Sequence, residues 1–227
     1  MARRTKAEAE RTRDSLLDAA EALFDERGVS RTTLTDIATA AGLTRGAVYW
    51  HFKDKADVFN AVMDRVFVPM EALIQAAVAP DKADALAGLR AVISDELKLL
   101  VHDARLRRVA HIARHKIEFT AELEAAQQRR VVVREAFLKL TGSALARAAD
   151  KAQIALPMPV ADAARGLHAL LDGLIHIWLL DAGSFDLHQG AMQSFDVYVR
   201  GLGLTLSPDY KTAYFGIKWV FKAVKPA

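Results

Sequence analysis

The chain has 227 residues, of which 52% are hydrophobic and 26% are charged. This composition is typical of a globular protein and excludes a disordered chain. The 12 glycines and 6 prolines are too few for an all-β fold with many turns. Because the sequence has no cysteine, it excludes a disulfide framework, a cysteine-based zinc site, an iron–sulfur cluster and a thiol nucleophile.

The sequence predicts a cytoplasmic protein without a cofactor. The absence of cysteine suits a reducing compartment. The basic N-terminus is not followed by the apolar segment of a secretory signal. No uncharged apolar stretch reaches the ~18 residues that a membrane span needs, so we expect no stable membrane association.

The formal net charge of +3 does not by itself indicate a nucleic-acid partner. Residues 1–66 hold 11 basic and 11 acidic side chains, and residues 67–206 hold 16 of each. The whole excess therefore lies in residues 207–227, which hold four lysines and one aspartate. An argument for DNA binding must rest on where individual charges lie.

The first 66 residues predict four helices separated by turns. Apolar residues recur every three or four positions up to Arg27, and Gly28 suits the left-handed end of a helix. Thr33 and Asp36 have the spacing that caps a helix start. The remaining predicted boundaries are the end of the second helix at Gly42, the cap of the third at Thr44 and the cap of the fourth at Asp54.

The rest of the chain also predicts helices, so we expect an all-α fold. Pro69 and Pro80 are expected to mark the joins that lead into this second region. Its predicted helices cover about residues 83–101, 105–118, 122–150, 160–181 and 189–206. The predicted domains are a head (1–66), a helical bundle (67–207) and a basic, aromatic extension (208–227).

The spacing at residues 33–51 is that of a helix-turn-helix, with a tight turn at Gly42. We expect its inner face to hold Ile37, Ala38, Val48 and Phe52. The N-terminal residues of the second helix would then face a DNA major groove. The alternative to DNA binding is a helical hairpin with a solvated polar face. The predicted DNA-binding residues are Thr33, Thr44, Arg45, Gly46, Tyr49, Trp50, His51, Lys53 and Lys55.

Two stretches go beyond this pattern, GVSRTTLTDIA from Gly28 and AGLTRGAVYWHFKDK from Ala41. They resemble the TetR family of transcriptional repressors, in particular its AcrR/TtgR branch, which controls multidrug efflux pumps. The resemblance is dense over residues 3–66 and thinner beyond. It implies an all-α homodimer with one DNA-binding head per subunit and a palindromic double-stranded operator. It also implies that Thr33, Tyr49, His51 and Lys55 contact phosphates, while Thr44, Arg45 and Gly46 approach bases.

The bundle offers apolar surface with a few polar groups, which suits a site for a small hydrophobic effector. A filled core is the alternative that helical periodicity alone favours, and the resemblance favours the pocket. The predicted ligand-binding residues are Leu89, Ile93, Ala110, His111, Arg114, Phe137, Leu171, Asp172, Ile175 and His176.

Two stripes of metal-ligating side chains support a second hypothesis, a metal-dependent helical enzyme. One is His111, His115 and Glu118, and the other is His168, Asp172 and His176. Because the sequence lacks the HExxH pattern, we expect no metal site and no catalysis.

Large apolar residues at helical spacing predict the face that pairs two subunits. The predicted residues of this dimer interface are Trp178, Phe195, Tyr198 and Leu202. A core within one chain is the alternative. The extension after Pro208 interleaves lysine with aromatic residues. It predicts an element packed on the bundle, with contact to bases or to a membrane interface as alternatives.

Overall fold

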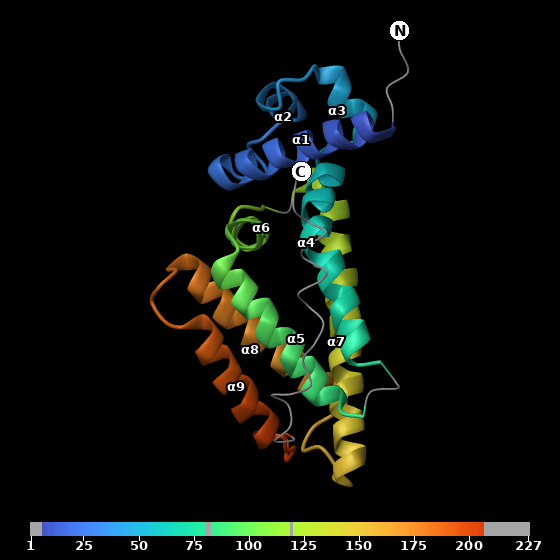
Figure 1. The fold of residues 1–227 in the computed structure, drawn as a ribbon, viewed down its shortest axis with the longest axis vertical. Helices are drawn as coiled ribbons and strands as arrows, with labels where there is room; N and C mark the ends of the chain where they lie inside the picture. The colour runs from blue at the N-terminus through green and yellow to red at the C-terminus, as the bar shows by residue number, and fades with distance from the viewer. Residues whose placement is uncertain (1–5, 80–82, 119, 207–227) are drawn as a thin grey trace. The chain divides into compact units, whose positions relative to one another are not determined.

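The computed structural model describes residues 6–79, 83–118 and 120–206. Over these residues the chain is helical throughout, with short connections (Figure 1). The helices are α1 (Lys6–Arg27), α2 (Leu34–Ala40), α3 (Arg45–His51), α4 (Lys55–Ala77), α5 (Ala85–His102), α6 (Ala104–His115), the single 3₁₀ turn η1 (Ala121–Leu123), α7 (Glu124–Ala152), α8 (Val160–Leu180) and α9 (Leu187–Gly201). The predicted all-α fold is confirmed. No helix of the described segments is long and apolar enough to cross a membrane.

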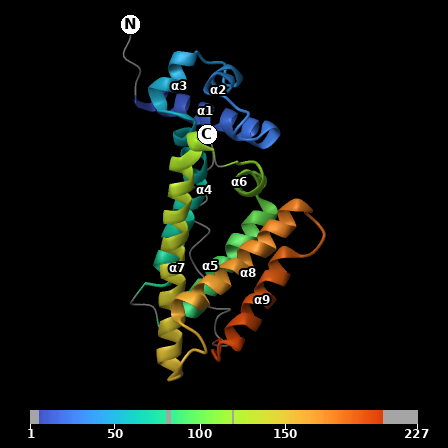
Figure 2. The same ribbon diagram turned by 180° about the vertical axis from the view of Figure 1, so that it is seen from behind.

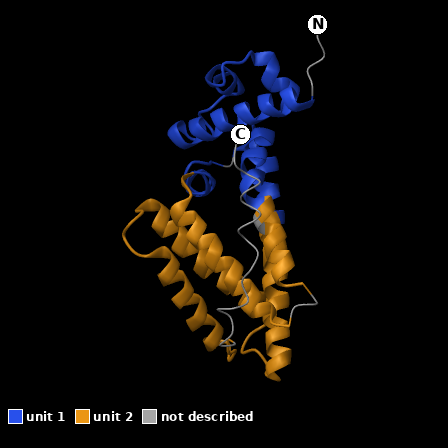
Figure 3. Cartoon of the chain, viewed as in Figure 1, with its two compact units in different colours: residues 1–67, 105–132 blue, residues 68–104, 133–227 orange. Residues whose placement is uncertain are grey.

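The chain forms two compact units that interleave along the sequence (Figure 3). The first unit comprises residues 1–67 and 105–132, and the second comprises residues 68–104 and 133–227. The head therefore shares its unit with α6 and the start of α7, which the sequence pattern does not predict. The boundary between the units runs through α4 and through α7.

Apolar side chains of α1, α3 and α4 build the core of the first unit. Leu16 and Phe24 of α1 are fully buried, as are Val48 of α3 and Phe59 of α4. The rings of Phe24 and Phe59 lie 6.3 Å apart in a tilted arrangement. Ile37 and Ala38 of α2 are buried with them, which confirms the predicted inner face of the helix-turn-helix.

The second unit packs α5 and α8 against α9 (Figure 2). Its core includes the fully buried Leu89, Leu167 and Phe195, one from each of these helices. The Arg90 guanidinium adds a bidentate ion pair to Asp196, with N–O distances of 2.7 and 2.8 Å. This pair fixes the register of α5 against α9 because both hydrogen bonds must form together.

The break in the helix expected at Pro69 is absent, because α4 continues through Pro69 to Ala77, although the boundary between the two units lies nearby, between residues 67 and 68. Proline removes one backbone donor from the helix ladder, which weakens a helix but does not end it where packing holds both sides. Buried Val62 and Val66 precede Pro69, and buried Ile74 follows it. Pro80 lies outside the described residues.

Candidate nucleic-acid interface and ligand site

Side-chain caps stabilise the starts of the two short helices of the helix-turn-helix. The Thr33 hydroxyl accepts a hydrogen bond from the Asp36 backbone N–H at 3.1 Å, and Asp36 Oδ2 accepts one from the Thr33 N–H at 2.9 Å. These bonds form the predicted capping box. The Thr44 hydroxyl likewise accepts from the Ala47 N–H at 3.3 Å. In each of these seven-residue helices, the N-cap side chain satisfies one of the backbone donors that the first turn leaves unpaired.

The turns have the geometry that the glycines predict. Gly28 and Gly42 both adopt positive φ, at 88° and 69°. Only glycine takes this conformation without strain. The turn at Gly42 therefore holds α2 and α3 in the arrangement that exposes one side of α3.

The outer face of α3 carries most of the predicted DNA-binding residues. Thr44, Arg45 and Gly46 are exposed at its start, and Tyr49 and Trp50 follow at 49% and 72% exposure. The Arg45 guanidinium carbon lies 5.5 Å from the centre of the Tyr49 ring, which is a cation–π contact. That contact restrains Arg45 on the exposed side of the helix.

His51, the last residue of α3, and Phe52, which follows it, are less exposed than the residues before them. His51 is half-buried, and its ring lies edge-on to the Trp50 ring at 4.5 Å between centroids. Phe52 is buried beneath the Arg13 guanidinium, whose carbon lies 5.2 Å from the ring centre. Trp50 is thus held against His51 while most of its indole surface faces solvent.

Two of the predicted phosphate contacts have other partners in the structure. The Thr33 hydroxyl donates its one proton to Asp36 Oδ2 at 2.7 Å. A phosphate that accepted this proton would replace that bond but would leave the two bonds of the capping box in place. Lys55 is only 5% exposed, so a phosphate would have to replace its present partners, and the contact stays a prediction. Its ammonium pairs with Glu122 and with the Ser30 carbonyl. Lys53, by contrast, is exposed.

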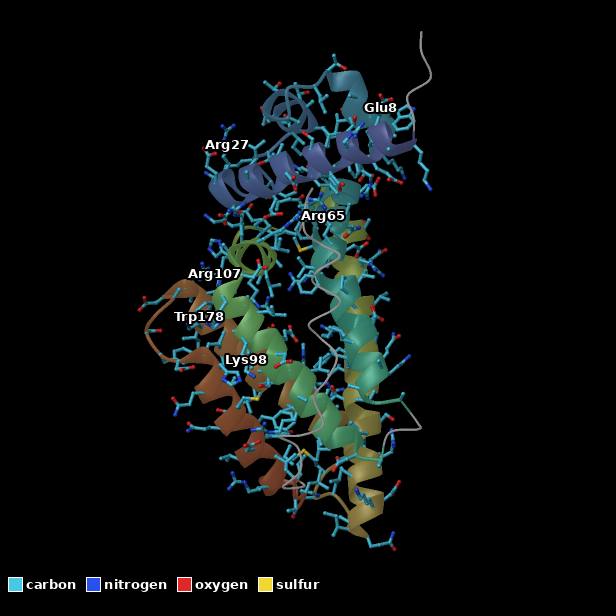
Figure 4. The ribbon with its side chains drawn as sticks, in the orientation of Figure 1. Glu8, Arg27, Arg65, Lys98, Arg107 and Trp178 are labelled. Atoms are coloured by element: carbon cyan, nitrogen blue, oxygen red, sulfur yellow. The ribbon has the colours of Figure 1, made fainter. Side chains whose placement is uncertain are left out.

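An acidic stripe on α1 joins this helix to α4 and α6 within the first unit. The stripe consists of Asp14, Asp18, Glu21 and Asp25. Arg65 of α4 pairs with Asp14 at 2.6 Å and with Asp18 at 2.7 Å, and its side chain extends toward α1 (Figure 4).

Glu21 is the buried member of the acidic stripe. Its carboxylate lies 3.1 Å from Arg105 Nε and 3.4 Å from Arg108 Nη1, both of α6. Burial raises the pKa of Glu21 above its ordinary value, while the charges of Arg105 and Arg108 act to lower it. The burial effect is the larger, so these arginines only partly offset the cost of burying the carboxylate.

The predicted ligand-binding residues fall into both units. Ala110, His111 and Arg114 belong to the first unit. Ala110 is buried, whereas the other two are half-buried. His111 Nδ1 lies 2.8 Å from Asp25 Oδ1. The geometry therefore places His111 in the contact between α6 and α1, which was not predicted.

The other predicted ligand-binding residues lie in the second unit. Four are buried and apolar, namely Leu89, Ile93, Leu171 and Ile175. Phe137 and Asp172 are half-buried, and the Phe137 ring lies 5.2 Å from the His168 ring. His176 is exposed, which contradicts its predicted place in a buried site.

The predicted dimer residues are mostly core residues of the single chain. Trp178, Phe195 and Leu202 are 5%, 0% and 3% exposed, so the prediction that they face a partner is wrong. The half-buried Tyr198 donates a hydrogen bond from its hydroxyl to the Ala163 carbonyl at 2.9 Å. Since α8 is apolar on more than one side, periodicity alone did not distinguish its inner face from its outer one.

The apolar side chains that the second unit exposes are different ones. On α8, Ile177 and Leu180 are 54% and 66% exposed, and on α9 Val197 is 65% exposed. Sequence analysis missed these three residues. Ile177 and Leu180 are three residues apart, a spacing that puts them on one side of a helix.

The described residues hold no group of three histidine, aspartate or glutamate side chains that could bind a metal ion. In the first predicted stripe, the His111 and His115 rings lie 5.3 Å apart, with His111 directed to Asp25. The extension at 208–227 lies outside the described residues, so its predicted contacts remain predictions.

Two family models match the chain. One, described as "Bacterial regulatory proteins, tetR family", matches residues 16–62, and the other, "MAATS-type transcriptional repressor, C-terminal region", matches residues 84–204. The chain is also similar to the HTH-type transcriptional regulator TtgR of Pseudomonas putida, with 43% identity over 188 residues. That match covers 82% of this chain and 89% of the relative.

Two solved structures are similar in fold and in sequence. NalD, the secondary repressor of the MexAB-OprM multidrug efflux pump in Pseudomonas aeruginosa, has a TM-score of 0.79 and 39% identity, covering 86% of this chain and 98% of that one. SmeT in complex with triclosan has a TM-score of 0.76 and 34% identity, covering 84% and 90%. SmeT is the repressor of the Stenotrophomonas maltophilia efflux pump SmeDEF.

Proposed function

Because the chain belongs to the TetR family of bacterial transcriptional regulators, we propose that it represses a multidrug efflux operon and is released by small hydrophobic compounds. In this proposal a homodimer binds a palindromic operator, and each subunit places α3 in a major groove. The chain is thus a transcriptional regulator and not an enzyme. The observation that carries the DNA-binding part is the exposed face of α3.

Arg45 is the residue we assign to base recognition. It stands at the start of α3, and its guanidinium is restrained over the Tyr49 ring. A guanidinium in this position suits the O6 and N7 atoms of guanine, and such a bidentate contact contributes ~1–3 kcal/mol of discrimination. Lys53 and Tyr49 are exposed beside it and supply donors for backbone phosphates.

The exposed apolar face of α8 and α9 supports a homodimer. Ile177, Leu180 and Val197 are each more than half exposed, and a second copy of the chain would remove them from water. A two-fold dimer would hold its two heads ~34–36 Å apart to reach successive major grooves. Replacing Ile177 and Leu180 together by Asp is expected to give monomers by analytical ultracentrifugation and to abolish operator binding.

The buried apolar residues of the second unit support a hydrophobic effector. Leu171 and Ile175 are buried on either side of the half-buried Asp172 along α8, a combination of apolar wall and polar anchor that suits such a ligand. SmeT, a similar protein, has been solved with triclosan, a chlorinated phenol. We therefore expect D172A to change the concentration of a phenolic compound that releases DNA. Its affinity for the operator without the compound should stay unchanged.

The test is selection of genomic fragments by the purified protein at near-physiological salt, with and without hydrophobic antibiotics and phenols. We expect one palindromic site beside a transporter operon, lost when an effector is added. R45M should weaken binding to that site by about tenfold or more, whereas R165M, the same change on α8, should bind like the wild type. Failure to recover any specific fragment, or equal recovery by R45M, would contradict the proposal.

A further inference from the structure

Thr141 of α7 buries a hydroxyl that has no hydrogen-bond partner among the described residues. The residue is 0% exposed. A threonine in a helix commonly donates to the carbonyl one turn earlier, as Thr39 does to the Thr35 carbonyl at 2.9 Å, but Thr141 makes no such bond. Because buried hydroxyls are nearly always bonded, an unpaired one marks a position where a polar atom of another molecule would be stabilised.

The Thr141 side chain lies on the side of α7 that faces α8. Successive residues of an α-helix are rotated by about 100°, so Thr141 falls between Phe137 and Gly142 around the helix axis. The Phe137 ring lies 5.2 Å from the His168 ring of α8. A Cβ at Gly142 would lie 3.4 Å from Cγ1 of Val160, the first residue of α8. Thr141 therefore lies within the part of the α7 surface that α8 covers.

The facing side of α8 carries the residues of the proposed effector site. From His168 onward, Leu171, Asp172 and Ile175 recur at intervals of three and four residues, which places them along one side of the helix. Leu171 and Ile175 are buried, and Asp172 is half-buried. An apolar wall thus runs along α8 from the neighbourhood of Thr141 past the Asp172 carboxylate.

The Thr141 hydroxyl and the Asp172 carboxylate lie at different levels of this wall. The contacts given above place Thr141 between the levels of Val160 and His168 on α8. Asp172 lies one further turn beyond His168, a rise of about 6 Å. The two polar groups are therefore separated by at least that rise along α8, with apolar side chains between them.

We propose that Thr141 is a second polar anchor of the effector site, and that the effector is an elongated, uncharged compound with a hydrogen-bonding oxygen at each end. The inference rests on the function proposed above and names the class of effector for its ligand site. One end of the effector donates to the Asp172 carboxylate. The other end bonds to the Thr141 hydroxyl, which can donate or accept. The body between them is apolar, because the wall formed by Leu171 and Ile175 offers it no polar partner.

Calorimetric titration of the DNA-free protein with two probes tests the inference. One probe is biphenyl with a para-hydroxyl group on both rings, and the other carries this group on one ring only. The wild type should bind the first about threefold to tenfold more tightly, as one additional hydrogen bond predicts. T141V should lose this preference, and T141S, which keeps the hydroxyl, should retain it. Both variants should bind the monohydroxy probe like the wild type, because the charged Asp172 is the stronger partner for its single hydroxyl.

The stability of the free protein provides a second test that needs no ligand. Thr32 is the matched control, because it is also 0% exposed but its hydroxyl donates to the Gly28 carbonyl at 2.9 Å. T32V should lower the midpoint of thermal unfolding, since it leaves a buried carbonyl without this donor. T141V should leave the midpoint unchanged or raise it, since it removes a buried hydroxyl that has no partner in the chain.

Two results would overturn the inference independently of each other. A T141V midpoint that falls as far as that of T32V would show that the folded protein itself satisfies the hydroxyl. An undiminished preference of T141V for the dihydroxy probe would show that the hydroxyl does not contact the effector. A wild type that binds its operator but neither probe would refute the inference and leave the regulator in place. Failure to bind any operator would refute the proposed function, whereas the titrations without DNA decide the role of Thr141.

Discussion

Replacing Arg105 by Met tests whether the contact between α6 and α1 depends on charge. Arg105 Nε lies 3.1 Å from Glu21 Oε2, and its Nη2 lies 3.1 Å from Asp18 Oδ1. The substitution keeps an apolar stem of similar length but removes both bonds. It leaves the Glu21 carboxylate, whose side chain is 4% exposed, with Arg108 as its remaining cation in this cluster at 3.4 Å.

The expected loss lies between two limits. Breaking a fully buried ion pair costs ~3–5 kcal/mol, whereas an exposed pair contributes ~0–1 kcal/mol. The Arg105 side chain is 33% exposed and Arg108 remains in place, so solvent and the second cation offset part of the loss. We expect a decrease in the free energy of unfolding of about 2 kcal/mol, which corresponds to roughly 4–8 °C in the midpoint of thermal unfolding for a chain of this size.

The pH dependence identifies Glu21 as the cause. Burial raises the pKa of Glu21 above 4.5, and the Arg105 charge opposes this, so R105M should raise that pKa further. A carboxyl with a higher pKa in the folded state than in the unfolded state takes up its proton first when folded. Its burial penalty is therefore present at high pH and is relieved as the pH falls through the folded pKa toward 4.5.

The assay is thermal unfolding of R105M and wild type at pH 7 and pH 5.5, at equal protein concentration. The difference between them should shrink at the lower pH, and E21Q should restore most of the stability of R105M at pH 7. R134M is the control, because Arg134 and Glu135 form an exposed pair at 3.2 Å within α7. Equal losses at both pH values, or no rescue by E21Q, would refute the assignment to a buried carboxylate.

Two further predictions concern backbone geometry. G88A should destabilise the second unit by about 1–3 kcal/mol, since a Cβ at Gly88 would overlap the Ala77 carbonyl oxygen. Urea denaturation followed by circular dichroism measures this loss of stability. A denaturation midpoint equal to the wild-type value would contradict the prediction. T33A should remove the side chain that caps α2 and cost ~1 kcal/mol in the same assay, while T33S, which keeps the hydroxyl, should behave like the wild type.

The head shows how much local sequence chemistry determines. The caps at Thr33 and Thr44 and the left-handed Gly42 all agree with the sequence prediction. Each depends on atoms within three or four residues of one another, so the residue types in order are sufficient to predict it. The exposed side of α3 follows for the same reason, because Val48 marks its buried side.

Tertiary structure decided the features that depend on distant partners. Lys53 and Lys55 are two residues apart, yet one is exposed and the other is buried against Glu122, 67 positions later in the chain. The same reason explains why Trp178 lies in the core while the neighbouring Ile177 is exposed. Periodicity identifies the apolar sides of a helix, but only the elements that pack against it determine which side is covered. The sequence by itself thus determined the helices and the exposed face of α3, and packing between distant segments decided which side chains of α4 and α8 are buried.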